Sequence, residues 1–233
     1  MGPVAASVSV EMPELPDVVV YIEALRVRVQ GEVLRRLRVK APQLLRTYDP
    51  PISAVEGRVV SGLRRIGKRI VFEFDDELFL IIHLMVSGRL AWAKPGAAIP
   101  GKVGLAALDF DDGTLLYREA ATKKRAGMWM VRGEESLAAH DRGGVEPLGV
   151  DVEAFREALT RENRTLKRAL TDPRIFSGIG NAYSDEILHA AGLSPVKRTG
   201  QLTGEEIERL HTATQRMLLE WTDRLRDETG DCL

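Results

Sequence analysis

The first regular pattern in the chain is a run of apolar residues at helical spacing. These residues are Leu15, Val18, Val19, Ile22, Leu25 and Val29. Such spacing gathers the apolar side chains on one face of a helix. Pro16 suits the first turn of that helix, and Gly31 suits its end. The pattern predicts one amphipathic helix at the start of a domain.

Residues 33–131 follow a different pattern, made of short runs rich in β-branched and aromatic side chains. The clearest runs are residues 69–74, 78–83, 104–110 and 114–117. The sequences Asp75-Asp76 and Asp111-Asp112-Gly113 separate pairs of these runs and are typical of hairpin turns. We therefore expect about eight strands packed as two sheets, with the first helix laid alongside.

A glycine and proline cluster at residues 143–149 is followed by helical periodicity with hardly any strand pattern. Within it, Thr203-Gly204-Glu205-Glu206 has the sequence of a capping box and predicts the start of a long helix. The fold class expected is α+β. We expect a disordered extension at residues 1–11, a β-sandwich domain with a leading helix at 12–135, a linker at 136–150 and an all-helical domain at 151–233.

Composition and charge limit the class of protein. Of the 233 residues, 44% are hydrophobic and 29% are charged, which is ordinary for a globular protein and excludes fibrous and disordered classes. The net charge of -1 hides basic segments at residues 26–46 and 58–69, which are compatible with a polyanionic partner. The single cysteine, Cys232, excludes a disulfide within the chain and favours the cytoplasm, and no apolar run has membrane-spanning length.

Four sequence motifs carry candidate chemistry. Residues 12–17 read Met-Pro-Glu-Leu-Pro-Asp, and Lys68 stands just before an alternating strand. The stretch 83–88 reads His-Leu-Met-Val-Ser-Gly, and residues 123–127 read Lys-Lys-Arg-Ala-Gly. Residues 166–188 include Ser-Gly-Ile-Gly-Asn at 177–181, where two glycines precede a helix start and leave amides free for a phosphate oxygen. Read singly, each motif also has an ordinary structural interpretation, as a helix start, a solvated strand end or a turn.

Together and in this order, the motifs resemble the formamidopyrimidine-DNA glycosylase and endonuclease VIII family over about residues 12–231. The resemblance implies a base-excision-repair glycosylase that removes oxidised purines and then cleaves the abasic site as a lyase. It implies that Pro13 is the nucleophile once its amine is exposed, that Glu14 transfers a proton and that Lys68 is a second base or a phosphate ligand. The expected partner is damaged double-stranded DNA, and we expect a monomer that is cytoplasmic and associated with the nucleoid.

The same resemblance implies a set of DNA-binding residues: Lys124, Arg125, Lys167 and Asn181. Lys124 and Arg125 lie in the loop whose basic residues contact phosphate in the family. Two positions depart from the family pattern, because Val86 and Ala126 stand where a methionine and an aromatic residue usually fill the gap left by an extruded base. Lesion recognition is therefore expected to differ from that of the family's best-known members.

The carboxyl-terminal end of the sequence also departs from the family. Family members commonly continue into a zinc-binding hairpin with two Cys-x-x-Cys pairs, whereas this sequence ends Gly230-Asp231-Cys232-Leu233. The four thiolates of that zinc site are absent, so we expect no metal and no cofactor in this chain. The chain is either a truncated product or a relative that works without the finger.

Two further functions stay open on the sequence. A DNA-binding protein without catalysis is one, because the nitrogen of an internal Pro13 is a tertiary amide with no usable lone pair. An RNA-binding protein that shares only the two-turn element at residues 166–188 is the other. The matches at residues 12–17 and at Lys68 count against the RNA-binding protein, since such a protein has no need of these residues.

Overall fold

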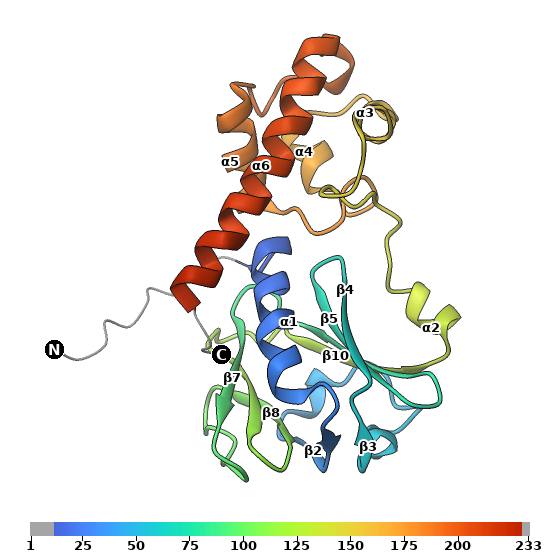
Figure 1. Cartoon of the computed structure of the whole chain (residues 1–233), viewed down its shortest axis with the longest axis vertical. Coiled ribbons are helices and arrows are strands. Elements are labelled where there is room, and N and C mark those ends of the chain that lie inside the picture. The colour runs from blue at the N-terminus through green and yellow to red at the C-terminus, as the bar shows by residue number, and fades with distance from the viewer. Residues whose placement is uncertain (1–11, 230–233) are drawn as a thin grey trace, which may run out of the picture.

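The computed structural model describes residues 12–229. It has a lower part built of sheets and an upper part built of helices, with the first helix against the sheets and the last helix reaching down beside it (Figure 1). The expected α+β class, a β-sandwich with a leading helix followed by a helical domain, is confirmed. The predicted disordered extension at residues 1–11 lies outside the described residues.

The lower part contains two four-stranded antiparallel sheets, as the alternating runs predicted. One sheet has the order β10-β6-β5-β4, with bounds Gly127–Arg132, Leu78–His83, Arg69–Phe74 and Gly62–Ile66. The other has the order β2-β8-β9-β7, with bounds Arg36–Val39, Gly104–Asp109, Thr114–Glu119 and Gly88–Ala93. A short ribbon of β1 (Val33–Leu34) and β3 (Arg58–Val59) adds to the two sheets that the sequence predicted. Two short 3-10 turns, η1 (Pro42–Leu44) and η2 (Ile52–Val55), lie between these strands.

Helix α1 (Leu15–Val29) connects two separate hydrophobic cores. Val18, Ile22 and Leu25 pack into the core between the sheets, whereas Leu15 belongs to the core of the helical part. Pro16 lies in the first turn, and Gly31 follows the helix with φ +87°, a conformation that favours glycine. Because both ends of one helix are buried in different cores, α1 fixes how the two parts meet.

The upper part consists of α3 (Val152–Thr160), α4 (Leu166–Thr171), α5 (Asn181–Ala191), η3 (Thr199–Gln201) and α6 (Gly204–Thr229). The capping box before α6 forms as predicted: the Thr203 amide donates to the Glu206 carboxylate at 2.9 Å, and the Glu206 amide donates to the Thr203 hydroxyl at 3.2 Å. Near its other end, α6 is tied to α1 by an ion pair of 2.7 Å between Arg226 and Glu23.

The segment between the two parts contains a short helix and is hydrogen-bonded to the helical part. Helix α2 (Glu134–Ala138) occupies its start. Further along, the Val145 amide donates to the Ile175 carbonyl, and the Ser177 amide donates to the Val145 carbonyl, both at 2.9 Å. These two hydrogen bonds attach the glycine-rich segment to the loop before α5.

Candidate active site

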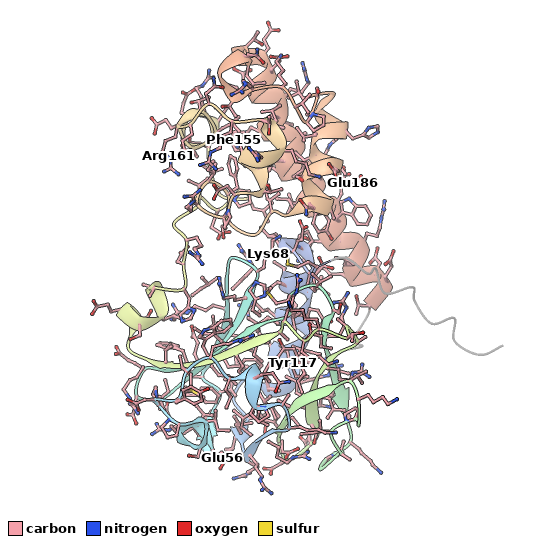
Figure 2. The ribbon with its side chains drawn as sticks, turned by 180° about the vertical axis from the view of Figure 1, so that it is seen from behind. Glu56, Lys68, Tyr117, Phe155, Arg161 and Glu186 are labelled. Carbon is pink, nitrogen blue, oxygen red and sulfur yellow. The ribbon has the colours of Figure 1, made fainter. Side chains whose placement is uncertain are left out.

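The candidate active site is built around a buried carboxylate at the start of α1. Glu14 is 2% exposed, and its carboxylate accepts hydrogen bonds from the amides of Gly180 at 2.5 Å and Ala182 at 3.2 Å. The Lys68 ammonium lies 3.7 Å from the same carboxylate, and its side chain is 14% exposed. Lys68 comes from the β4–β5 hairpin, so three segments far apart in the sequence meet here. Figure 2 shows Lys68 where the sheet part and the helical part meet.

Burial shifts the pKa values of Glu14 and Lys68 in opposite directions. Burial raises the pKa of Glu14, although the Lys68 charge and the Gly180 amide act to lower it. Burial lowers the pKa of Lys68, and the nearby Glu14 carboxylate acts to raise it. Each group is thus pushed towards its neutral form, the form in which a carboxylic acid can donate a proton and an amine can accept one.

Pro13 is buried and directly precedes Glu14, and the half-buried carboxylate of Asp17 follows three residues after Glu14. Asp17 accepts a hydrogen bond from the Glu14 amide at 3.0 Å and one from the Tyr183 hydroxyl at 3.4 Å. The Leu15 amide donates to the Gly178 carbonyl at 3.0 Å. The first turn of α1 is therefore held to α5 and its preceding loop by several hydrogen bonds, and Pro13 is fixed with it.

Two glycines before α5 allow this close approach. Gly178 has φ +84°, and a Cβ there would lie 2.9 Å from the Leu15 Cβ. At Gly180 a Cβ would lie 2.0 Å from Lys68 Nζ and 2.1 Å from Glu14 Oε1. The sequence predicted that the backbone makes a close approach at these two glycines. The structure shows Leu15 packed against Gly178, and Glu14 and Lys68 packed against Gly180.

The hairpin that carries Lys68 is braced against the helical part. Gly67 turns the chain with φ +58°, and the Arg65 guanidinium donates to the Gly67 carbonyl at 2.6 Å. The same guanidinium donates to the Ser177 hydroxyl at 3.3 Å and forms an ion pair with Glu146. These contacts tie the hairpin to the loop before α5, which holds Lys68 in place.

Lys167 and Asn181 lie together at the junction of α4 and α5. The Lys167 ammonium donates to the Asn181 carbonyl at 3.1 Å and forms an ion pair of 2.5 Å with Asp185. Asn181 begins α5, as predicted, and it directly follows Gly180, whose amide contacts Glu14. These two residues therefore adjoin the buried pair.

Lys124 and Arg125 lie in a loop that another carboxylate holds. Glu119, 1% exposed, accepts hydrogen bonds from the amides of Arg125 at 3.0 Å and Ala126 at 3.3 Å, and Lys124 donates to the Glu119 carbonyl. Ala126 is 3% exposed and packs into the core of the sandwich. The loop leads into β10, whose first residue pairs with His83 in β6.

His83 lies at this end of the sheet, in the last position of β6. Its Nδ1 accepts a hydrogen bond from the Met85 amide at 3.0 Å, and burial, with the charges of Arg69 and Lys68, lowers its pKa to about 4. The imidazole is therefore neutral near pH 7. After it, Met85 has φ +55° and Val86 is 38% exposed, so the loop presents a short side chain where the family usually has methionine.

The structure thus brings Pro13, Glu14, Lys68, Lys167 and Asn181 together. Lys124 and Arg125 lie at the same end of the sheet as Lys68 by strand register, but within residues 12–229 no hydrogen bond or ion pair joins them to Glu14 or Lys68. Sequence reasoning assigned no role to Asp17 or Glu119. Asp17 had one signal, because it follows Glu14 by three residues at a helix start, the spacing of a capping carboxylate.

The family's zinc finger does not fit the residues present. The chain has one cysteine, and across residues 12–229 no three His, Cys, Asp or Glu side chains gather as a metal site would require. Separately, none of the helices between residues 12 and 229 is both long and apolar enough to cross a membrane.

Comparisons with known proteins agree with this geometry. The model of the formamidopyrimidine-DNA glycosylase N-terminal domain matches residues 12–127, and that of the formamidopyrimidine-DNA glycosylase H2TH domain matches residues 144–225. A formamidopyrimidine-DNA glycosylase of Symbiobacterium thermophilum is 33% identical over 219 residues, which cover 91% of this chain and 71% of that protein. One of Roseiflexus is 33% identical over 227 residues, with 93% and 82% covered.

Solved structures show the same likeness. The Lactococcus lactis enzyme bound non-covalently to DNA containing an AP site is 27% identical, with a TM-score of 0.83 and coverage of 92% of this chain and 85% of that one. A mutant of that enzyme bound to DNA containing Fapy-dG is 27% identical, with a TM-score of 0.82. The sandwich, the two-turn element and the buried carboxylate–lysine pair define a DNA-repair glycosylase architecture. The chain belongs to the formamidopyrimidine-DNA glycosylase family.

Proposed function

We propose that this protein removes oxidised purines from duplex DNA and then cleaves the abasic site, using the amine of Pro13. The observation that carries the proposal is the buried Glu14–Lys68 pair, at 3.7 Å, beside a buried Pro13. Functional groups whose pKa values are shifted by burial and that meet from separate segments are typical of catalytic sites. The relatives named above are DNA glycosylases, and the solved neighbours hold damaged DNA.

The proposed reaction uses the chain's own groups. The secondary amine of Pro13 attacks the deoxyribose C1′, the bond from C1′ to the base breaks, and the base leaves with its electron pair and a proton. Glu14, whose pKa is raised by burial, supplies a proton, and Lys68 is placed to accept one or to bind phosphate. The amine proton passes to the departing base and leaves a neutral aminal. The C1′–O4′ bond then breaks, O4′ takes its electron pair and the Glu14 proton, and the nitrogen lone pair forms the iminium. Transfer of a C2′ proton to Lys68 expels the 3′-phosphate from C3′ with the electron pair of its bond, which cleaves the strand.

The DNA-binding residues proposed are Lys124, Arg125, Lys167 and Asn181. Lys167 and Asn181 adjoin the buried pair, so a strand bound there would place a sugar near Pro13. Phosphate contacts of this kind position DNA without reading its sequence. We propose further that the protein acts as a monomer in the compartment that holds the DNA and needs no zinc.

The test is covalent trapping by borohydride on duplex DNA with an oxidised purine. A protein that begins at Pro13 should be trapped, because reduction fixes the iminium formed by a secondary amine. The matched control is the chain that retains residues 1–12, in which the Pro13 nitrogen is an amide and no trapping is expected. Equal trapping of both proteins would overturn the assignment of Pro13.

A second function is favoured by one observation: residues 1–12 precede Pro13 in the given sequence, and while they are attached its nitrogen is a tertiary amide. In that form the protein would bind DNA without catalysis. Sequencing the amino terminus of the protein from its host separates the two functions, since only a Pro13 terminus supports the reaction. Binding without trapping by the Pro13 form would favour the second function.

A further inference from the structure

A hollow rich in arginine lies in the helical part, outside the site described above. It has a volume of about 720 Å³ and is formed by Arg142, just before the glycine-rich segment, and by α4 with the loops on either side of it. Its lining includes Arg142, Arg164, Arg168, Arg174, Asp172 and Thr171. We call this feature the arginine pocket. Arg161, labelled in Figure 2 on the side of the helical part where the chain descends to the sheets, donates to the carbonyl of the lining residue Arg174 at 2.8 Å.

The charge in the arginine pocket is unbalanced. Four guanidinium groups line it against a single carboxylate, that of Asp172. Arg164 and Arg174 both contact this carboxylate, at 2.6 and 2.7 Å, and their hydrogen bonds hold its pKa well below the usual range. Arg164 also pairs with the Glu162 carboxylate outside the lining, so two carboxylates face four guanidiniums and an excess of positive charge remains.

The remaining two arginines have no such acceptor. Arg142 and Arg168 are exposed, and within the part of the chain that the structure describes neither forms a hydrogen bond or an ion pair. The pocket therefore combines two guanidiniums held in place by Asp172 with two that are available to a ligand. Preorganised donors of this kind lose less entropy when a ligand binds.

The pocket continues the surface around the buried pair. On one side, the Arg69 guanidinium donates to the carbonyl of His140, two residues before Arg142, at 3.1 Å, and Arg69 directly follows Lys68. On the other side, Arg168 directly follows Lys167, which contacts the Asn181 carbonyl. The pocket thus adjoins two elements proposed to contact DNA.

We propose that the arginine pocket binds a backbone phosphate of the DNA strand, as a second anchor beyond the lesion. The planar guanidinium fork matches two phosphate oxygens, and several such groups around one hollow suit an anion with more than one acceptor oxygen. The proposal rests on the proposed function for the identity of the nucleic acid. It adds a contact supplied by residues of the helical part.

The test measures affinity for an undamaged duplex against salt concentration. The variant Arg142→Gln with Arg168→Gln removes the two available guanidiniums and leaves the Arg164–Asp172–Arg174 contacts intact. The control, Arg36→Gln with Lys102→Gln, removes the same charge from exposed positions in the sheet part. We expect the pocket variant to reduce the slope of log affinity against log salt by about 0.9, the value for one phosphate contact. We expect the control to retain the slope.

Two further measurements make the outcome decisive. Single-turnover base release at saturating enzyme should be equal in the pocket variant and the wild type, since the pocket does not touch the reacting atoms. If the protein is not a glycosylase, base release will be absent from the wild type and from both variants. The dependence of DNA affinity on salt will still show whether the arginine pocket binds phosphate. An unchanged slope in the pocket variant, or an equal reduction in the control, would overturn the proposal. Loss of inorganic phosphate binding without a change in the DNA slope would assign the pocket to a free phosphate and also overturn it.

Discussion

Replacing Gly180 by alanine should disable the site through packing alone. The new Cβ would lie 2.0 Å from Lys68 Nζ and 2.1 Å from Glu14 Oε1, whereas ordinary contacts between heavy atoms begin at about 3.5 Å. One or both side chains must therefore move by about 1.5 Å, which follows from the difference between these values. A misplacement of about 1 Å costs a catalytic site about 100-fold in rate, so we expect at least that loss in base release. The strain of overpacking should lower the free energy of unfolding by about 1–3 kcal/mol.

The assay is single-turnover release of an oxidised purine by the form beginning at Pro13, with urea unfolding measured in parallel. Gly149→Ala is the matched control, because a Cβ there meets nothing within 4 Å. Rates are compared at a temperature where both proteins are folded, so that unfolding does not imitate a catalytic defect. If Gly180→Ala released base at the wild-type rate and unfolded as Gly149→Ala does, the packing argument would be refuted.

Three further predictions concern pH, salt and metal. The pKa of His83 is about 4 in the folded state, below its ordinary value of 6.5, so the unfolded state takes up the proton first as the pH falls. The free energy of unfolding should therefore fall by up to about 3 kcal/mol between pH 6.5 and pH 4. Urea unfolding of His83→Asn should show a weaker dependence on pH over this range. Lys167→Ala and Asn181→Ala should weaken binding to damaged and undamaged duplex alike, and Lys167→Ala alone should also reduce the slope of log affinity against log salt by about 1. Asp185→Asn should strengthen binding, because it releases Lys167 from its ion pair. Unchanged affinity in all three variants would show that the two-turn element does not contact DNA. Elemental analysis of the 233-residue chain should find no stoichiometric zinc, and chelators should leave its fold intact, because the chain has one cysteine. One zinc ion per chain would contradict this prediction.

The sequence alone determined the secondary structure of the functional segments. The strands expected at residues 69–74 and 78–83 have those bounds as β5 and β6, and α1 and α6 begin close to their predicted caps. These features are local, since alternation, helical spacing and capping depend on residues only a few positions apart. The ordered motifs also identified the family, because their chemistry is carried by short strings such as residues 12–17 and 177–181.

Only the tertiary structure decided what these residues contact. The Gly180 amide and the Glu14 carboxylate are 166 positions apart, and no periodicity links such distant groups. Burial, which shifts the pKa values of Glu14 and Lys68, likewise arises only when both domains close over them. The arginine pocket shows the same limit. Its residues are Arg142, before the glycine-rich segment, and others from α4 and the loops on either side of it, and their excess charge is apparent only once the fold places them around one hollow.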